Sequence, residues 1–139
     1  MQGKKIILAV VFALGLAWAQ APASVWDGIY STAQAGRGEA LYKTECASCH
    51  GDKLQGKGQT PPLAGSDFIM NWNGMTVGDV FDKMQTSMPA DQPGRLSRDQ
   101  NATLLAYILS ANKFPSGGAD LSSNAERLHR IRFEEAKGK

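Results

Sequence analysis

The feature that most constrains the fold of this chain is the pentapeptide Cys46-Ala47-Ser48-Cys49-His50, which contains both cysteines of the 139 residues. Two thiols separated by two residues stand about one helical turn apart, and the next side chain projects beneath them. In the C-x-x-C-H pattern both thiols add to the vinyl groups of a haem, and the imidazole binds its iron. The motif therefore predicts one covalently attached haem c, held by Cys46 and Cys49 with His50 as an iron ligand.

Three other roles for these thiols have to be weighed. A Cys46–Cys49 disulfide would close a very short loop and would restrain the unfolded chain little. A redox dithiol of the thioredoxin type is expected in a βαβ setting, and no alternating strand pattern is found in the sequence. A zinc site needs four ligands, whereas His129 is the only other histidine and no third cysteine exists. Haem attachment accounts for the motif best.

The N-terminal residues have the pattern of a secretory signal. Lys4 and Lys5 precede an apolar run from Ile6 to Trp18, and Ala17-Trp18-Ala19 offers small residues for cleavage. The alternative is a membrane anchor, but the run is about 13 residues long, short of the roughly 20 that span a bilayer as a helix. We therefore predict a signal peptide at residues 1–19, an exported or periplasmic protein, and no stable membrane insertion.

The charge balance narrows the classes of partner. Lys4 and Lys5 account for the whole excess of 15 Lys and Arg over 13 Asp and Glu, so the remaining chain is formally neutral. Binding to duplex nucleic acid draws most of its affinity from phosphate neutralisation by a basic surface, which this chain lacks. Nucleic acid is not an expected partner. We predict a lead at 20–31, one domain at 32–113 and a C-terminal extension at 114–139.

The pattern of apolar residues and caps predicts helices and no sheet. Residues 32–46 read as a helix with Ser31 or Thr32 as its cap and with Ala35, Ala40, Leu41 and Tyr42 facing a core. Capping boxes beginning at Thr76 and Ser97 start two more helices, at about 77–86 and from 98 to Asn112. A third box at 123–126 precedes a tail that is a short helix or an extended strap. Residues 51–68 are rich in Gly, Pro and polar residues and read as a long loop, which a buried cofactor would organise.

Beyond the haem motif, the chain resembles the class I cytochrome c family over residues 36–112. Gly38 and Tyr42 precede Cys46 as the family's Gly and aromatic pair does, and Tyr107 matches the aromatic residue of the last helix. Glycine lets two helices approach closely at such a crossing. The resemblance implies an all-α class I cytochrome c fold, with three to four helices around one haem.

The resemblance also assigns roles around the haem. Pro61-Pro62-Leu63-Ala64-Gly65 resembles a segment in which the first proline's carbonyl accepts the proton of the ligand histidine, which points to Pro61, with Pro62 as its possible substitute. The side chains with a sulfur or nitrogen to offer as second axial ligand are Met70, Met75, Met84, Met88 and His129. Met88, before Pro89, resembles the family's ligand methionine, whereas Met84 reads as core filling and His129, among arginines, as part of a solvated face. Trp72 resembles the tryptophan that donates to a haem propionate, or is a plain core residue.

These features imply a one-electron carrier and not an enzyme, because an iron with two protein ligands leaves no open site. The expected partners are redox proteins, a dehydrogenase or an oxidase, and the carrier is expected to be a monomer. Residues 88–97 also resemble cytochromes that accompany quinoprotein alcohol dehydrogenases. An alternative is a tightly bound electron-transfer subunit of a dehydrogenase, in which the extension, with Arg127, Arg130 and Arg132, docks on an acidic partner.

Overall fold

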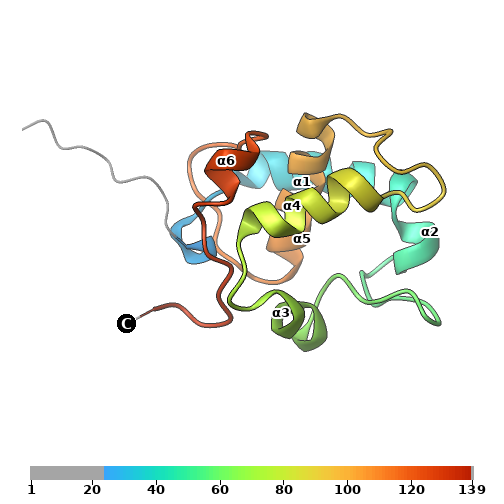
Figure 1. Ribbon diagram of the computed structural model, residues 1–139, viewed down its shortest axis with the longest axis horizontal. Coiled ribbons are helices and arrows are strands. Elements are labelled where there is room, and N and C mark those ends of the chain that lie inside the picture. Colours follow the sequence, from blue (N-terminus) through green and yellow to red (C-terminus); the bar gives the residue numbers. More distant parts are fainter. Residues whose placement is uncertain (1–23, 139) are drawn as a thin grey trace, which may run out of the picture.

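The computed structural model describes residues 24–138, and the predicted signal segment lies outside them. The described chain is helical and contains no strand (Figure 1). Its elements are η1 (Val25–Asp27), α1 (Thr32–Glu45), α2 (Ala47–His50), α3 (Ser66–Trp72), α4 (Val77–Ser87), α5 (Arg98–Ala111) and α6 (Ala125–Leu128). No helix within this part of the chain is long and apolar enough to cross a membrane. The predicted all-α class is confirmed.

The crossing of α1 and α5 forms the centre of the fold. A Cβ atom added to Gly38 would lie 2.2 Å from the Thr103 carbonyl oxygen and 2.8 Å from Tyr107 Cβ, so only glycine permits this approach. The Tyr42 and Tyr107 rings meet beside it, with centroids 5.3 Å apart. The close contact that Gly38, Tyr42 and Tyr107 predict is confirmed.

Gly38→Ala should therefore destabilise the protein strongly. The added methyl group meets backbone on α5, which cannot yield cheaply, and we expect a loss of at least about 2 kcal/mol in the free energy of unfolding. Gly36→Ala on the same helix is the matched control, since nothing lies within 4 Å of its added Cβ. Alanine there should raise stability by about 0.5–1 kcal/mol. Thermal melting of both holoproteins checks the prediction, and equal melting temperatures would contradict it.

Local signals placed the long helices well. Ser31 caps α1, and complete capping boxes start α4 at Thr76 and α5 at Ser97. The loop predicted at 51–68 ends three residues early, because α3 starts at Ser66. This helix lacks a side-chain cap at Gly65, so the sequence offers no start signal for it.

Two smaller expectations were wrong. Asn124, and not Ser123, caps α6 by accepting from the Arg127 N–H. Ala40 is exposed, because the buried face of α1 runs through Ala35, Gly38 and Tyr42, and Ala40 lies on the opposite side of the helix.

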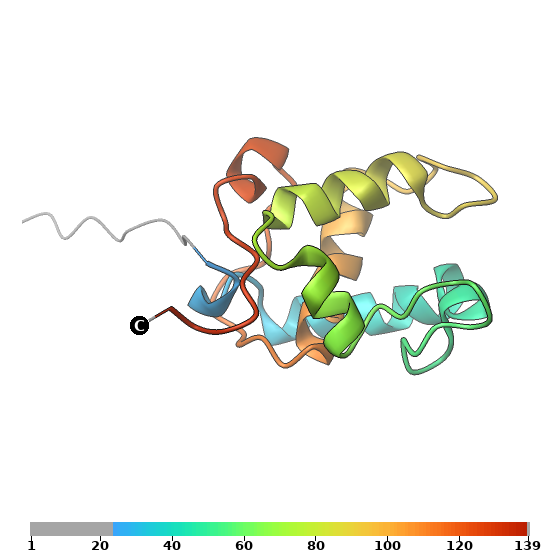
Figure 2. The ribbon, with the colours of Figure 1, turned by 60° about the horizontal axis from the view of Figure 1, so that its bottom comes forward.

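The C-terminal extension packs on the domain as a strap. Residues 131–133 run between residues 24–25 and the segment 74–77, which links α3 to the first residue of α4, as Figures 1 and 2 both show. The Arg132 carbonyl accepts from Val25 N–H at 2.9 Å, and Phe133 N–H donates to the Met75 carbonyl at 2.8 Å. The apolar side chains of the tail, Leu121, Leu128, Ile131 and Phe133, are all buried. Of the two alternatives for the tail, the structure has a short helix followed by an extended strap.

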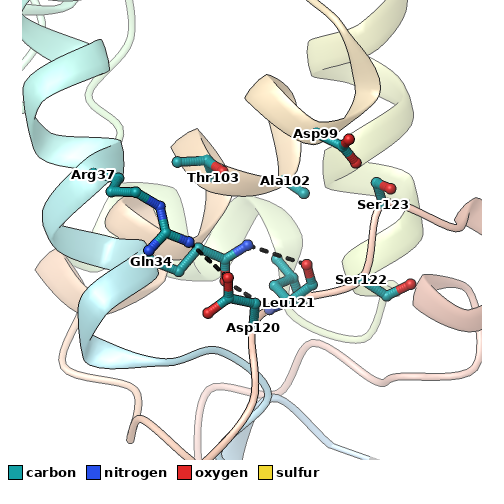
Figure 3. Close-up of a pocket in the computed structure, with 9 residues that line it drawn as sticks. All are labelled: Gln34, Arg37, Asp99, Ala102, Thr103, Asp120, Leu121, Ser122 and Ser123. Carbon is teal, nitrogen blue, oxygen red and sulfur yellow. Dashed lines mark hydrogen bonds and ion pairs between the residues drawn. The ribbon is translucent and has the colours of Figure 1, made fainter.

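The start of the extension also closes over α1. Gln34 is buried there, and its side chain accepts from the Leu121 N–H and donates to the Leu121 carbonyl, at 2.6 and 3.1 Å. Arg37 forms an ion pair with Asp120 at 2.6 Å. These contacts line a polar pocket of about 400 Å³ between α1, the first turns of α5 and residues 120–123 (Figure 3). None of the sequence-predicted site residues lines this pocket.

Candidate haem-attachment site

The end of α1 delivers the C-x-x-C-H motif. The Cys46 N–H donates to the Tyr42 carbonyl at 2.9 Å, and α2 then makes a single turn that ends at His50. The Tyr42 hydroxyl reaches past this turn and donates to the Gly51 carbonyl at 2.7 Å. Tyr42 therefore holds both ends of the motif, while its ring packs on α5.

Neither thiol is engaged in a disulfide. Cys46 is half-buried and Cys49 is exposed. Burial raises the pKa of the Cys46 thiol to about 11, with a smaller contribution from the neighbouring Glu45 carboxylate. Both sulfurs are thus available for attachment, and in the unattached chain Cys46 is a neutral thiol at physiological pH.

His50 is buried and held in one orientation. Its Nδ1 lies 2.9 Å from the Pro61 carbonyl oxygen. A carbonyl can only accept, so Nδ1 carries the proton and the lone pair is left on Nε2. No atom of residues 24–138 forms a hydrogen bond with that Nε2. The bond that Pro61 was predicted to make to the ligand histidine is present, and Pro62 does not replace it.

The loop between His50 and α3 is fixed by backbone bonds and one side chain. Gly56 N–H donates to the His50 carbonyl at 2.7 Å, and Gly56 adopts φ +78°, where a Cβ would meet the Thr60 oxygen at 2.6 Å. Asn112, at the end of α5, accepts from the Gly65 N–H at 3.0 Å and donates to the Leu63 carbonyl at 2.9 Å. The segment that carries Pro61 is therefore tied to α5.

Met88 sits at the end of α4 in extended conformation and is half-buried. Met84 packs against the hydrophobic core, as expected of a core residue, whereas Met88 is not among the side chains that do so in the described chain. Met70 and Met75 are 63% and 41% exposed. Among these four methionines, Met88 is the one that directly follows a helix, is partly shielded from solvent and does not pack against the core.

Trp72 ends α3 and is half-buried against Phe68, with ring centroids 6.4 Å apart. Phe68 in turn meets Phe133 of the strap, at 6.0 Å between centroids. The indole N–H of Trp72 has no hydrogen-bond partner among residues 24–138. The ring is thus held by the core while its donor remains available.

The residues present fit a haem c. Two reduced thiols, an imidazole with a free Nε2 and an unpartnered indole donor are the groups that such a cofactor uses. Two of the segments that carry candidate haem-binding residues, α2 and the loop that follows α4, lie at the end of the molecule away from the two described termini (Figure 2). The structure places the segments of His50 and Met88 at that same end.

Sequence reasoning missed three residues that hold this site, Asn112 and the pair Arg95 and Glu45. Asn112 reads in the sequence as a helix stop, and only the fold shows that its amide clamps the loop before α3. The ion pair between Arg95 and Glu45, which joins the loop after α4 to the end of α1, was also missed. Charged residues 50 positions apart carry no local signal of pairing, because the fold alone brings them together.

Comparison with known proteins agrees with this geometry. The family described as cytochrome c oxidase, cbb3-type, subunit III matches residues 33–108. The chain is 34% identical over 92 residues to the cbb3-type cytochrome c oxidase subunit CcoP of Azospirillum brasilense, covering 55% of this chain and 30% of that protein. It is 32% identical over 95 residues to the cytochrome bc1 complex cytochrome c subunit of Corynebacterium diphtheriae, covering 66% of this chain and 32% of that protein.

A solved structure is also similar. A chain of the sulfane dehydrogenase SoxCD from Paracoccus pantotrophus superposes with a TM-score of 0.51 at 26% identity, covering 84% of this chain and 62% of that one. The chain spans less than a third of the length of the two curated relatives.

This chain therefore belongs to the cytochrome c family, with the class I fold that the resemblance implied. Its cofactor is a covalently attached haem c, for which Cys46, Cys49 and His50 form the motif.

Proposed function

We propose that this protein is an exported single-haem electron carrier with His50 and Met88 as the two axial ligands of the iron. The observation that carries the proposal is the state of His50: its Nδ1 is bound to the Pro61 carbonyl, and its Nε2 has no hydrogen-bond partner among residues 24–138. When bound, the haem supplies a centre that cycles between Fe(III) and Fe(II), and a His and Met ligand pair raises its potential. Pro61 orients the imidazole and increases its basicity through the Nδ1 hydrogen bond.

Met88 is the proposed sixth ligand because of its place in the chain. It ends α4, and Pro89 turns the chain out of the helix so that the preceding side chain is free to turn inward. Its half-buried state outside the core supports this assignment over Met84. With both axial positions taken by the chain, small oxidants find no vacant site, so the expected role is transfer of electrons and not catalysis.

Trp72 is proposed to donate its indole N–H to a haem propionate, since that donor has no protein partner in the described chain. Cys46 and Cys49 are proposed to form the two thioethers. The proposed domain runs from 32 to 113, preceded by a lead at 20–31 and followed by the extension at 114–139. Export rests on Lys4, Lys5 and the apolar run after them. That the carrier is a monomer stays a prediction.

A second candidate is an electron-transfer subunit bound permanently to a dehydrogenase. It is favoured by the similarity to a chain of a sulfane dehydrogenase, and the two curated relatives are named as subunits of an oxidase and of a bc1 complex. Both candidates use the same haem and differ in whether the partner stays bound. Co-purification of a dehydrogenase with the native protein at high salt would favour the subunit, and its absence would favour the free carrier.

Met88→Ala tests the proposed ligation. We expect the variant to lose the weak near-infrared band of methionine-ligated ferric haem and to bind added cyanide far more readily, because the sixth position is opened. Met84→Ala, on the same helix, is the control and should keep the band while losing some stability through a cavity. Near-infrared absorption spectra of the two ferric variants, recorded with and without cyanide, distinguish the two methionines as ligands. Survival of the band in Met88→Ala with loss in Met84→Ala would show that the wrong sulfur was chosen.

A further inference from the structure

The segment between α4 and α5, residues 88–96, is called here the Met88 loop. Residues 90–95 are all exposed, and Leu96 is the first buried side chain after α4. Three backbone hydrogen bonds lie within the loop, from the N–H groups of Gln92, Gly94 and Arg95, at 3.0 to 3.4 Å. A segment with so few buried contacts opens more easily than the core.

The base of the loop is held on the α5 side. Gln85 of α4 donates to the Leu96 carbonyl at 3.3 Å, and Asn101 of α5 donates to Gln85 and to the same carbonyl, at 3.1 and 3.4 Å. These bonds fix the point where the chain enters α5. They do not reach the part of the loop between Met88 and Arg95.

Arg95 supplies the other attachment. It is the only residue of the Met88 loop whose side chain forms a hydrogen bond or ion pair with any of residues 24–138, and its partner is Glu45. Glu45 is the last residue of α1, immediately before Cys46, and its side chain is 17% exposed against 39% for Arg95. The pair thus joins the loop of the proposed sixth ligand to the helix that delivers the attachment cysteines.

Because of the position of Glu45, a cationic partner stabilises its carboxylate more than it would on an open surface. A carboxylate at the C-terminal end of a helix faces the negative end of the helix dipole, which disfavours it. A guanidinium at that point offsets both charges, and partial burial of the carboxylate reduces screening by salt. The electrostatic influence of Arg95 also extends to the adjacent Cys46 thiol.

We propose that the Arg95–Glu45 ion pair is a latch that holds the Met88 loop against the end of α1 and so keeps Met88 on the iron. The inference rests on the proposed function, because it assumes that Met88 is the sixth ligand. Arg95 is a positioning residue that acts through the loop. An external ligand for the iron binds only molecules in which the loop has opened, so its apparent affinity rises in proportion to the open fraction.

The test is a cyanide titration of the ferric holoprotein at low ionic strength. Arg95→Gln should raise the apparent cyanide affinity about 3- to 10-fold, the range expected for a partly buried ion pair. Glu45→Gln should have a similar effect, and the double variant should not exceed either single one. The swap of Arg95→Glu with Glu45→Arg should return the affinity to within about twofold of the original. The near-infrared band should remain in all four variants.

Arg37→Gln is the matched control, because it removes another α1 ion pair, with Asp120, and should leave the cyanide affinity unchanged. An affinity in Arg95→Gln within twofold of the original, or additive effects in the double variant, would overturn the latch. Met88→Ala separates the two proposals. If it opens the iron to cyanide and Arg95→Gln does not, the latch alone is wrong. If Met88→Ala changes neither the band nor the affinity, the ligation is wrong and the latch falls with it.

Discussion

Replacing Cys46 and Cys49 together by alanine is expected to release the haem from the polypeptide entirely. Thioether bonds survive acid-acetone extraction, whereas haem held only by ligation and packing is removed by it. Essentially all haem should stay with the original chain, and none with the double variant. Extraction followed by the mass of the intact protein measures this directly.

Ser48→Ala is the control for that experiment, because it keeps both thiols and removes from the same turn only the hydroxyl that donates to Cys49 Sγ at 3.9 Å. It should retain its haem fully. Haem that stays bound to the double variant through extraction would show that the cofactor is attached elsewhere. The double variant should also melt at a much lower temperature, because residues 51–65 have few buried side chains of their own, Leu54 being the main one.

Deleting residues 119–139 should destabilise the domain severely. The deletion removes four buried side chains, Leu121, Leu128, Ile131 and Phe133. Each contributes about 1.5–3 kcal/mol when fully buried, so the loss is roughly 6–12 kcal/mol as an upper bound. A typical domain has about 5–15 kcal/mol of net stability. We therefore expect a melting temperature lowered by tens of degrees, or no cooperative transition.

The same deletion also removes the basic residues through which the extension would dock on an acidic partner, a role called here the docking arm. A second variant is therefore needed to separate docking from stability. Arg127→Gln with Arg130→Gln removes two exposed cations and leaves the buried side chains in place. A strap predicts unchanged melting and an unchanged rate of reduction by a partner dehydrogenase at every salt concentration. A docking arm predicts slower reduction with a weaker salt dependence. A truncated chain that melts like the original would contradict the strap.

The sequence predicts most of this fold because its signals are local. Capping boxes at Thr76 and Ser97 and the cap at Ser31 mark helix starts through bonds within four residues. Gly38 is informative for a different reason, since a glycine in a helix costs stability and usually marks a close approach. Short elements without caps, such as α3, carry no comparable signal.

The residues of the candidate site likewise fall into two groups, those predicted from local sequence and those that only the fold brings together. Cys46, Cys49 and His50 follow from five adjacent letters, whereas the role of Pro61 needed a family resemblance before the structure placed its carbonyl 2.9 Å from His50 Nδ1. The Arg95–Glu45 pair and the Asn112 clamp depend on segments brought together by folding. The strap could not be predicted either, because its buried side chains pack on residues distant in the sequence, on α3 and at 24–25.

An absorption spectrum of the purified protein, recorded during a redox titration, tests the covalent haem and its proposed ligation together. We predict a haem c spectrum that converts between oxidised and reduced forms in one step, with a slope of about 59 mV per tenfold change in ratio, as one electron requires. The ferric form should show the near-infrared band of methionine ligation. A protein that shows no haem absorption, or a ferric haem that lacks this band, would contradict the account.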